Sequence, residues 1–461
     1  MLLFIVCRIG DFNGLYGQDA YEYARYAEEI NQFFKGGEFP KPFFWPIIFP
    51  LCGAILKFFI GDIAVSLQLV SVFSLGGTAF FLSKILNAFF PEKQKKSRWF
   101  ILIFICFSPY LIRSSVQVLA DSLGLFFLVC GSYHSLLYLN SRKGKDLWLT
   151  LFLLCMSCMT RYGNAVVAVI PLGMAGYSAI KDKRFQHILF ACTAGVLAVL
   201  PHLILQHKGN TSFLSHPWLT TWSPANLFSR EFSTPDGILS FDVPNIVYVG
   251  KAILHPGFIF PALLFLITSF SIVGEASKFL RNFCISWIAV YGFFLAGIPY
   301  QNTRYLIPLI PPIAILCFPG FSFLTDKFSD RKRYLIAGIS IAILTNLTLS
   351  VLASKKSYFL NREEKLIANG VCRNFPGSVY TVGFEGSMKY YCPERKVISI
   401  WKRGFENPQN RDLILLNEAR WGDQWRLLEV AENIAGLKEK YSWVLLEDFP
   451  DNWKLYQLEV K

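Results

Sequence analysis

The sequence has little charge for its length. Asp, Glu, Lys and Arg make up 17% of the 461 residues, whereas about a quarter of the residues in a typical soluble protein are charged. This shortage excludes an ordinary soluble domain. Hydrophobic residues make up 53% of the chain, in runs near or above ~17 residues that short charged patches interrupt. The pattern predicts a polytopic α-helical membrane protein.

The sequence also lacks the features of several function classes. It has no internal repeat, no low-complexity segment and no Gly-rich phosphate loop at the ends of its expected strands. His202 and His255 each lie beside a proline with no second ligand at metal spacing, which is typical of structural histidines. Cys155 and Cys158 have the spacing of a redox pair, but they lie in an apolar run, where a thiol behaves as a small hydrophobic group.

The net charge of +13 is consistent with a membrane protein that has basic cytoplasmic loops. The cations lie between the apolar runs, as in cytoplasmic loops, so no nucleic-acid partner is expected. The first run is short before Arg8 and lacks the cleavage pattern of a signal peptide. The runs predict eleven transmembrane helices, at about 1–9, 63–87, 99–113, 116–138, 147–160, 163–180, 188–205, 250–272, 283–298, 304–322 and 334–353.

The basic residues predict the orientation. The positive-inside rule compares alternate loops, and the more basic set is cytoplasmic. Sixteen Lys and Arg residues lie in five alternate loops, at 91–98, 141–146, 181–187, 274–282 and 325–334. The N-terminus is therefore expected in the cytoplasm and the C-terminal part outside. The apolar stretch 41–61 would reverse this order as a further span, so we expect an interfacial or re-entrant helix there.

The chain divides into two expected domains. Residues 1–353 form the transmembrane domain, with outer loops at 10–62, which contains interfacial helices, and at 206–249. Residues 354–461 are more polar and form a small extracytoplasmic α/β domain. Its expected strands and amphipathic helices alternate, with strands at 378–384, 396–401, 413–418 and 441–448 and helices at 362–375 and 422–441.

Two cysteines of the C-terminal domain, Cys372 and Cys392, lie outside the apolar runs. Disulfides form in oxidising compartments. An extracytoplasmic domain would therefore allow these two residues to form one.

Ionisable side chains gather at the outer ends of the expected spans. Charges at membrane depth are costly, so their placement is informative. A carboxylate can accept the proton of an acceptor hydroxyl, and guanidinium groups bind a leaving phosphate while staying charged. Together they indicate transfer from a phosphate-linked lipid. The residues concerned are Asp11, Asp19, Glu22, Asp62, Asp121, Arg113, Arg161 and Arg304.

Each of these residues also has a structural explanation. Asp121 could simply pair with Arg113, and Asp62 could cap the helix that follows it. Arg161 and Arg304 could extend their guanidinium groups to the membrane interface. The sequence leaves these alternatives open.

The stretch LYGQDAYEYARYAEEI (15–30) poses the sharpest choice. Its apolar residues follow helical spacing, which predicts an amphipathic helix on the outer membrane surface. Asp19 and Glu22 have the spacing of a helix capping box. Asp19 is therefore expected either to cap this helix or to act as a base, and its outer position favours the base.

Several segments together resemble one family. The segment Asp19-Ala20-Tyr21-Glu22-Tyr23 matches the Asp and the Tyr of an acidic D-E-x-x-Y motif, with Ala20 in place of the Glu. FPKPFFWPIIFP (39–50), TRYGN (160–164) and NTRYLIPLIP (302–311) are similar to further segments of the family in order and spacing. Over residues 10–320 the chain resembles integral-membrane glycosyltransferases of the C-type fold, close to the protein O-mannosyltransferase and aminoarabinose-transferase group.

The resemblance implies an inverting transferase at the outer face, in a location such as the bacterial inner membrane. Its donor would be a polyprenyl-phosphate-linked sugar. It would require no cofactor; a divalent metal is not indicated, although the absence of the motif's Glu leaves that alternative open. Asp19 would be the general base, and Arg304 and Arg161 would bind the lipid phosphate. Further substrate-binding residues are expected at Asp121, Tyr23, Glu22, Tyr305 and Asp11.

Two other functions remain open at this stage. A transporter or lipid-sugar flippase would also have many spans, although such proteins often have repeated halves and polar residues near the membrane midplane. A ligase or polymerase acting on a lipid-linked oligosaccharide would use related chemistry. The acceptor, whether lipid, glycan or protein, is expected to contact loop 206–249 and the C-terminal domain.

Overall fold

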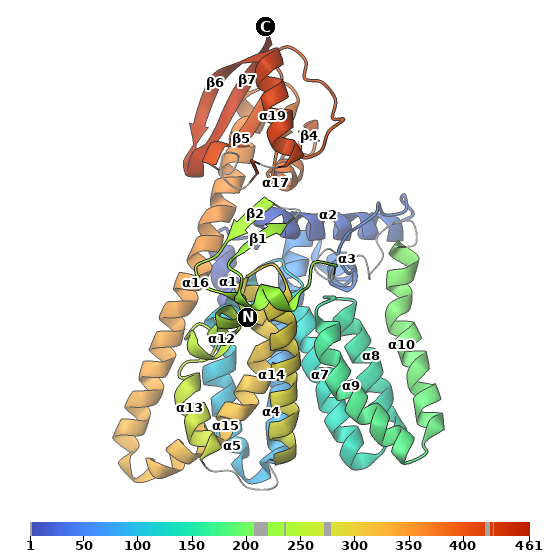
Figure 1. The fold of residues 1–461 in the computed structure, drawn as a ribbon, viewed down its shortest axis with the longest axis vertical. Helices are drawn as coiled ribbons and strands as arrows, with labels where there is room; N and C mark the ends of the chain where they lie inside the picture. The colour runs from blue at the N-terminus through green and yellow to red at the C-terminus, as the bar shows by residue number, and fades with distance from the viewer. Residues whose placement is uncertain (1, 207–219, 235–236, 272–277, 420–424, 427) are drawn as a thin grey trace.

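The computed structural model describes residues 2–461 except 207–219, 235–236, 272–277, 420–424 and 427. Figure 1 shows three levels: a bundle of long helices, a layer formed by the transverse helix α2 and a β-hairpin, and a small C-terminal domain beyond that layer. The long helix α16 runs along one side of the bundle and reaches the C-terminal domain.

The described residues contain seven helices that are long and apolar enough to cross a membrane, or eight if one bent pair is counted. The protein is thus an integral, multi-pass membrane protein. The seven are α4 (Ile63–Phe89), α7 (Asp121–Ser141), α9 (Asn164–Lys181), α10 (Phe185–Gln206), α14 (Lys278–Gly297), α15 (Ile310–Lys327) with the 3-10 turn Thr303–Leu309 before it, and α16 (Lys332–Asn374).

The other apolar segments are shorter or broken. The expected span 99–113 is bent by 64° between Pro91–Cys106 and Pro109–Val116, because a proline restricts the residue before it to an extended conformation. The expected span 250–272 is two short helices, on either side of a loop containing Pro256 and Pro261. The predicted count of eleven is therefore not confirmed. The shorter helices are α1 (Leu2–Ile9), α5 (Gln94–Phe100), α6 (Pro109–Val116), α8 (Gly144–Cys158), α12 (Asn245–Leu254) and α13 (Ala262–Phe270).

The layer above the bundle contains, besides the hairpin, two helices of the first long loop. The amphipathic helix α2 (Gly17–Phe34) lies across the end of the bundle (Figure 1) and buries its Ala, Tyr and Ile side chains. Helix α3 (Ile48–Ile60) has 13 residues, too few for a ~20-residue membrane crossing. The hairpin of the layer consists of β1 (Glu231–Thr234) and β2 (Gly237–Ser240).

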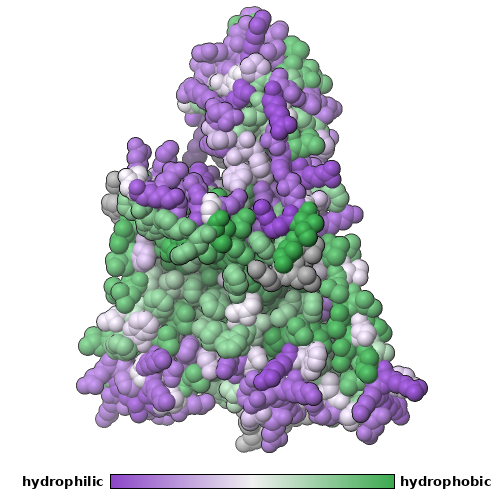
Figure 2. Space-filling view, turned by 180° about the vertical axis from the view of Figure 1, so that it is seen from behind, coloured by the Kyte–Doolittle hydropathy of each residue, from purple (hydrophilic) through white to green (hydrophobic). Residues whose placement is uncertain are grey.

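The surface hydropathy follows these levels. Figure 2 shows an apolar band across one face of the bundle, with polar surface at the bottom and over the C-terminal domain at the top. The basic turns from α7 to α8, from α9 to α10 and from α15 to α16 lie together at the bottom (Figure 1). This common face is what the positive-inside prediction requires.

The C-terminal domain has a five-stranded mixed sheet in the order β4-β3-β5-β7-β6. The side chains of β3 and β5 alternate between two clusters. Val379 and Leu413 pack with α16 and α17 (Glu385–Tyr391), whereas Tyr380 and Ile414 pack with α19 (Glu429–Lys440). The sheet is thus covered on both faces. The strands are β3 (Val379–Thr381), β4 (Val397–Ser399), β5 (Leu413–Asn417), β6 (Tyr441–Phe449) and β7 (Trp453–Val460).

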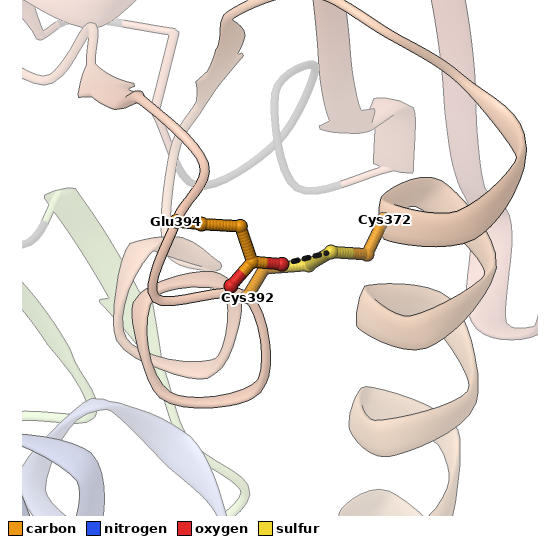
Figure 3. Close-up of side chains that lie close together, drawn as sticks. All are labelled: Cys372, Cys392 and Glu394. Atoms are coloured by element: carbon orange, nitrogen blue, oxygen red, sulfur yellow. Dashed lines mark hydrogen bonds between the residues drawn. A yellow bond between two sulfur atoms is a disulfide. The ribbon is translucent and has the colours of Figure 1, made fainter.

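Helix α16 belongs to both the bundle and the C-terminal domain. It continues without a break past residue 354, because its last turns carry Ile367, Ala368 and Val371 into the core beneath the sheet. Figure 3 shows the disulfide between Cys372, near the end of α16, and Cys392, just after α17. The Cα atoms are 6.1 Å apart, within the range usual for disulfides.

A glycine at the contact of α13 and α15 provides a test of the packing. A Cβ atom on Gly320 would overlap the carbonyl oxygen of Phe265. We expect Gly320→Ala to lower the free energy of unfolding by about 1–3 kcal/mol, as overpacking does in other cores, measured by thermal unfolding in detergent. Gly338→Ala, on an exposed part of α16 with no atom within 4 Å, is the control. Equal stability of the two variants would contradict the close packing.

Candidate functional site

Four charged side chains from separate parts of the chain form one cluster at the end of the bundle that faces α2. The carboxylate of Asp121 pairs with Nη1 of Arg161. Nε of Arg304 donates to Oδ2 of Asp121 at 3.0 Å, and Nη1 of Arg304 donates to Oδ2 of Asp19, also at 3.0 Å. The order in space is therefore Arg161, Asp121, Arg304, Asp19, with charges that alternate and cancel.

Local structure places each member of the cluster. Asp121 is the first residue of α7, where the helix dipole favours a carboxylate. Arg161 lies in the short turn between α8 and α9. Arg304 lies at the start of the 3-10 turn Thr303–Leu309, which begins where the side chain of Asn302 accepts a hydrogen bond from the Arg304 N–H. Asp19 is the third residue of α2.

The two carboxylates of the cluster differ in burial. The side chain of Asp121 is 1% exposed, whereas that of Asp19 is 38% exposed. A buried carboxylate between two arginines is suited to holding those arginines in place. The more open carboxylate of Asp19 remains accessible to a substrate.

Asp19 does not cap its own helix. The cap position of α2 is Tyr16, which makes no capping hydrogen bond through its side chain. Glu364 of α16 satisfies the helix end instead: Oε1 accepts from the N–H of Gly17 at 3.1 Å, and Oε2 accepts from the hydroxyl of Tyr21 at 2.7 Å. Asp19 points toward Arg304 and so belongs to the cluster.

Aromatic side chains surround the cluster. The guanidinium carbon of Arg161 lies 4.8 Å from the ring centroid of Tyr305, a cation–π contact. Tyr23 is buried against Phe49, and burial, reinforced by the charge of Asp19, raises its pKa. Its phenol therefore stays protonated and cannot act as a base at neutral pH.

The structure places the other candidate residues outside the cluster. Glu22 forms an ion pair with Arg25 at 2.7 Å, and Asp11 pairs with Lys365 while remaining 82% exposed. The carboxylate of Asp62 caps α4 by accepting from the N–H of Val65 at 2.8 Å. Arg113 lies over the ring of Tyr110. Asp121 therefore pairs with Arg161 and Arg304, not with Arg113.

Sequence reasoning missed Glu364, which lies 347 residues from the Gly17 N–H that it accepts. It occurs in an amphipathic segment where an acid normally faces water. Nothing in the local pattern relates it to α2.

One group of metal-ligating side chains lies together in the described residues: Cys372, Cys392 and Glu394. Figure 3 shows Glu394 beside the two sulfur atoms. These sulfurs are joined in a disulfide, and metals bind the free thiolate. The group therefore does not fit a metal centre.

Comparison with known proteins identifies the fold. Neither a protein-family model nor a curated protein matches the sequence. The crystal structure of ArnT from Cupriavidus metallidurans bound to undecaprenyl phosphate does match, with a TM-score of 0.60 and 12% sequence identity over 99% of this chain and 97% of that one. The chain has the ArnT fold. The apo structure of ArnT matches over the same shares, with a TM-score of 0.60 and 11% identity.

The match to ArnT confirms the fold that the motifs indicated, because ArnT is an aminoarabinose transferase with the C-type glycosyltransferase fold. The structural match extends over nearly the whole chain, whereas the sequence motifs that resemble the family lie within residues 10–320. The C-terminal domain, which contributed nothing to the sequence resemblance, therefore belongs to the ArnT-like architecture as well.

Removing the charge of Asp121 tests the cluster. Asp121→Asn keeps the size of the side chain but leaves two buried guanidinium groups with one carboxylate fewer. Breaking a buried ion pair in this way costs about 3–5 kcal/mol, so we expect a clear fall in the midpoint of thermal unfolding in detergent.

The matched control for this substitution is Asp62→Asn. Asp62 caps a helix without an arginine partner in the described contacts, and Asn caps helices as well as Asp. A stability loss in the control as large as that in Asp121→Asn would contradict the role assigned to the buried carboxylate.

Proposed function

We propose that the protein transfers a sugar from a polyprenyl-phosphate-linked donor to an acceptor hydroxyl at the outer face of the membrane, with inversion at the anomeric carbon. The observation that carries this proposal is the cluster: an accessible carboxylate, Asp19, bonded to an arginine that a buried carboxylate holds in place. Such a cluster offers a proton acceptor beside a binding site for phosphate.

The arginines retain the capacity to bind a phosphate. A guanidinium group has five N–H donors, and the described side-chain bonds of Arg304 use Nε and Nη1. Further donors on Arg304 and Arg161 are suited to the oxygens of a phosphate, which guanidinium groups bind bidentately. The related fold of ArnT, crystallised with undecaprenyl phosphate, supports a polyprenyl phosphate as the lipid.

The reaction follows from these groups. The acceptor hydroxyl attacks the anomeric carbon from the face opposite the phosphate, while Asp19 takes the hydroxyl proton. The bond between the anomeric carbon and the phosphate oxygen breaks, and its electron pair leaves with the polyprenyl phosphate. Arg161 and Arg304 stabilise the charge that grows on that leaving group. The new glycosidic bond has the opposite anomeric configuration.

Two observations support placing this chemistry outside the cytoplasm. The basic turns lie at the end of the bundle opposite the cluster (Figure 1). The Cys372–Cys392 disulfide, on the same side as the cluster, is of a kind that persists in oxidising compartments. The N-terminus would then face the cytoplasm and the C-terminal domain the outside, as in a bacterial inner-membrane enzyme.

Asp19 is the residue whose charge the reaction needs most. General-base catalysis contributes about 10²–10⁴-fold in rate, so we expect Asp19→Asn to lower transfer by that order while the protein still folds. Purified protein in detergent would be given a labelled polyprenyl-phosphate sugar and candidate acceptors, and release of polyprenyl phosphate would be measured. Detergent abolishes transport, so this assay also separates a transferase from a flippase.

The control for Asp19 is Glu28→Gln on the same helix. Glu28 pairs with Lys57 and lies outside the cluster, so transfer should stay near the wild-type rate. Wild-type transfer by a folded Asp19→Asn protein would refute the assignment of the base.

Arg304 provides an independent test of the phosphate site. Arg304→Lys keeps the positive charge, but one ammonium group cannot reproduce bonds from two nitrogens of a planar guanidinium. We expect about a tenfold rise in KM for the lipid donor, measured by initial rates at saturating acceptor. Arg25→Lys, whose partners Glu22 and Glu29 lie along α2, should have little effect, because surface ion pairs contribute at most about 1 kcal/mol. Unchanged donor kinetics in Arg304→Lys would count against a phosphate role.

A further inference from the structure

A cavity of about 370 Å³ lies between the first turn of α2, the outer part of α16, the β1–β2 hairpin and the C-terminal domain. Its volume falls in the usual range for small-ligand sites. None of the sequence motifs points to it, because its walls come from five separate regions of the chain: the four just named and the loop that contains Tyr300.

The chemistry of the walls is distinctive. Three carboxylates line the cavity, Glu363, Glu364 and Asp451, and among the described lining residues there is no Lys, Arg or His. Aromatic side chains form much of the remaining wall. They are Trp401, Trp425, Trp453, Phe384, Tyr16 and Tyr300.

The cavity adjoins the charged cluster in two ways. Tyr16, Gly17 and Gln18 line it, and the next residue along α2 is Asp19. The ring of Tyr300 also lies 5.7 Å from that of Tyr305, over which Arg161 is held. A ligand in the cavity would therefore contact the first turn of α2, which carries the residue proposed as the base, Asp19.

We propose that this cavity binds the acceptor of the transferase, and that the acceptor is a sugar ring with free hydroxyl groups and no anionic substituent. The inference rests on the proposed function and names its second substrate. It also locates the predicted contribution of the C-terminal domain and loop 206–249, since Leu239 of β2 is part of the wall.

The lining selects for this chemistry by charge and by shape. Ionised carboxylates only accept hydrogen bonds, so they bind hydroxyl or amino groups and repel phosphates and carboxylates. The negative faces of aromatic rings favour the C–H groups on the flat side of a sugar ring. A peptide offers as many carbonyl acceptors as N–H donors, which suits a wall of carboxylates less well. The lipid donor, being a phosphate, belongs on the arginine side of Asp19.

Binding can be measured without the donor. The full-length protein in detergent would be titrated by calorimetry with methyl glucoside, methyl glucosaminide, glucose 6-phosphate and a serine-containing peptide. We expect saturable binding of the first two probes only. Trp401→Ala and Asp451→Asn should each weaken it by about tenfold, whereas Trp401→Phe, which keeps an aromatic ring, should retain most of it.

Two controls match these variants. Trp443 is another half-buried tryptophan that packs on the same core cluster as Trp401 but does not line the cavity, so Trp443→Ala reports on loss of domain packing. Asp448 lies at the end of β6 outside the cavity, so Asp448→Asn reports on loss of surface charge. Both control variants should bind the sugars as the wild type does.

The outcomes separate this inference from the proposed function. Three results would overturn the acceptor assignment. The first is binding of glucose 6-phosphate or the peptide as tightly as methyl glucoside, and the second is no binding of methyl glucoside or methyl glucosaminide. The third is an equal loss of sugar affinity in the Trp401→Ala and Trp443→Ala variants. The protein could instead bind sugars in a way that depends on Trp401 and Asp451 but release no polyprenyl phosphate from the donor. That result would support the sugar site and overturn the proposed transferase function.

Discussion

The site depends on one buried carboxylate. Asp121, at the start of α7, binds Arg161 from the turn between α8 and α9 and Arg304 from the turn before α15. An unpaired charge is costly when it is buried as deeply as Asp121. The start of α7 and the two turns must therefore lie at the same height along the bundle. Arg304 then reaches out to Asp19 on the transverse helix α2. The same contacts that hold the bundle ends together therefore set the geometry of the proposed chemistry.

The C-terminal domain completes the site through α16. That helix continues from the bundle into the domain core, and on the way Glu364 accepts hydrogen bonds from the start of α2. Because Glu364 satisfies the helix end, Asp19 need not turn back toward its own backbone. A residue of α16 thus leaves the carboxylate of Asp19 free of the capping role and paired with Arg304. The cavity between these parts is the site that we propose for the acceptor.

Much of the architecture was predictable because its causes are local. The cost of placing apolar or charged groups in a bilayer depends on each segment's own composition, so most expected spans correspond to helices and the basic turns share one face. The strand β7 was missed because its core residues follow no single alternation: Trp453 and Leu455 pack in one core cluster and Leu458 packs in the other. The unbroken course of α16 also had no local signal, since polar composition beyond residue 354 suggested a boundary.

The sequence alone was sufficient to place Asp19, Asp121, Arg161 and Arg304 at one end of a membrane bundle, because hydropathy and loop charge specify depth along the membrane normal. The same reasoning placed Glu22 and Asp11 there, yet they pair with Arg25 and Lys365 away from the cluster. The depth of a residue in the membrane does not determine which way its side chain points around the helix axis, or which helices are neighbours. Those depend on packing between segments far apart in the chain, which is why the cluster, the cap from Glu364 and the aromatic cavity emerge only in the folded protein.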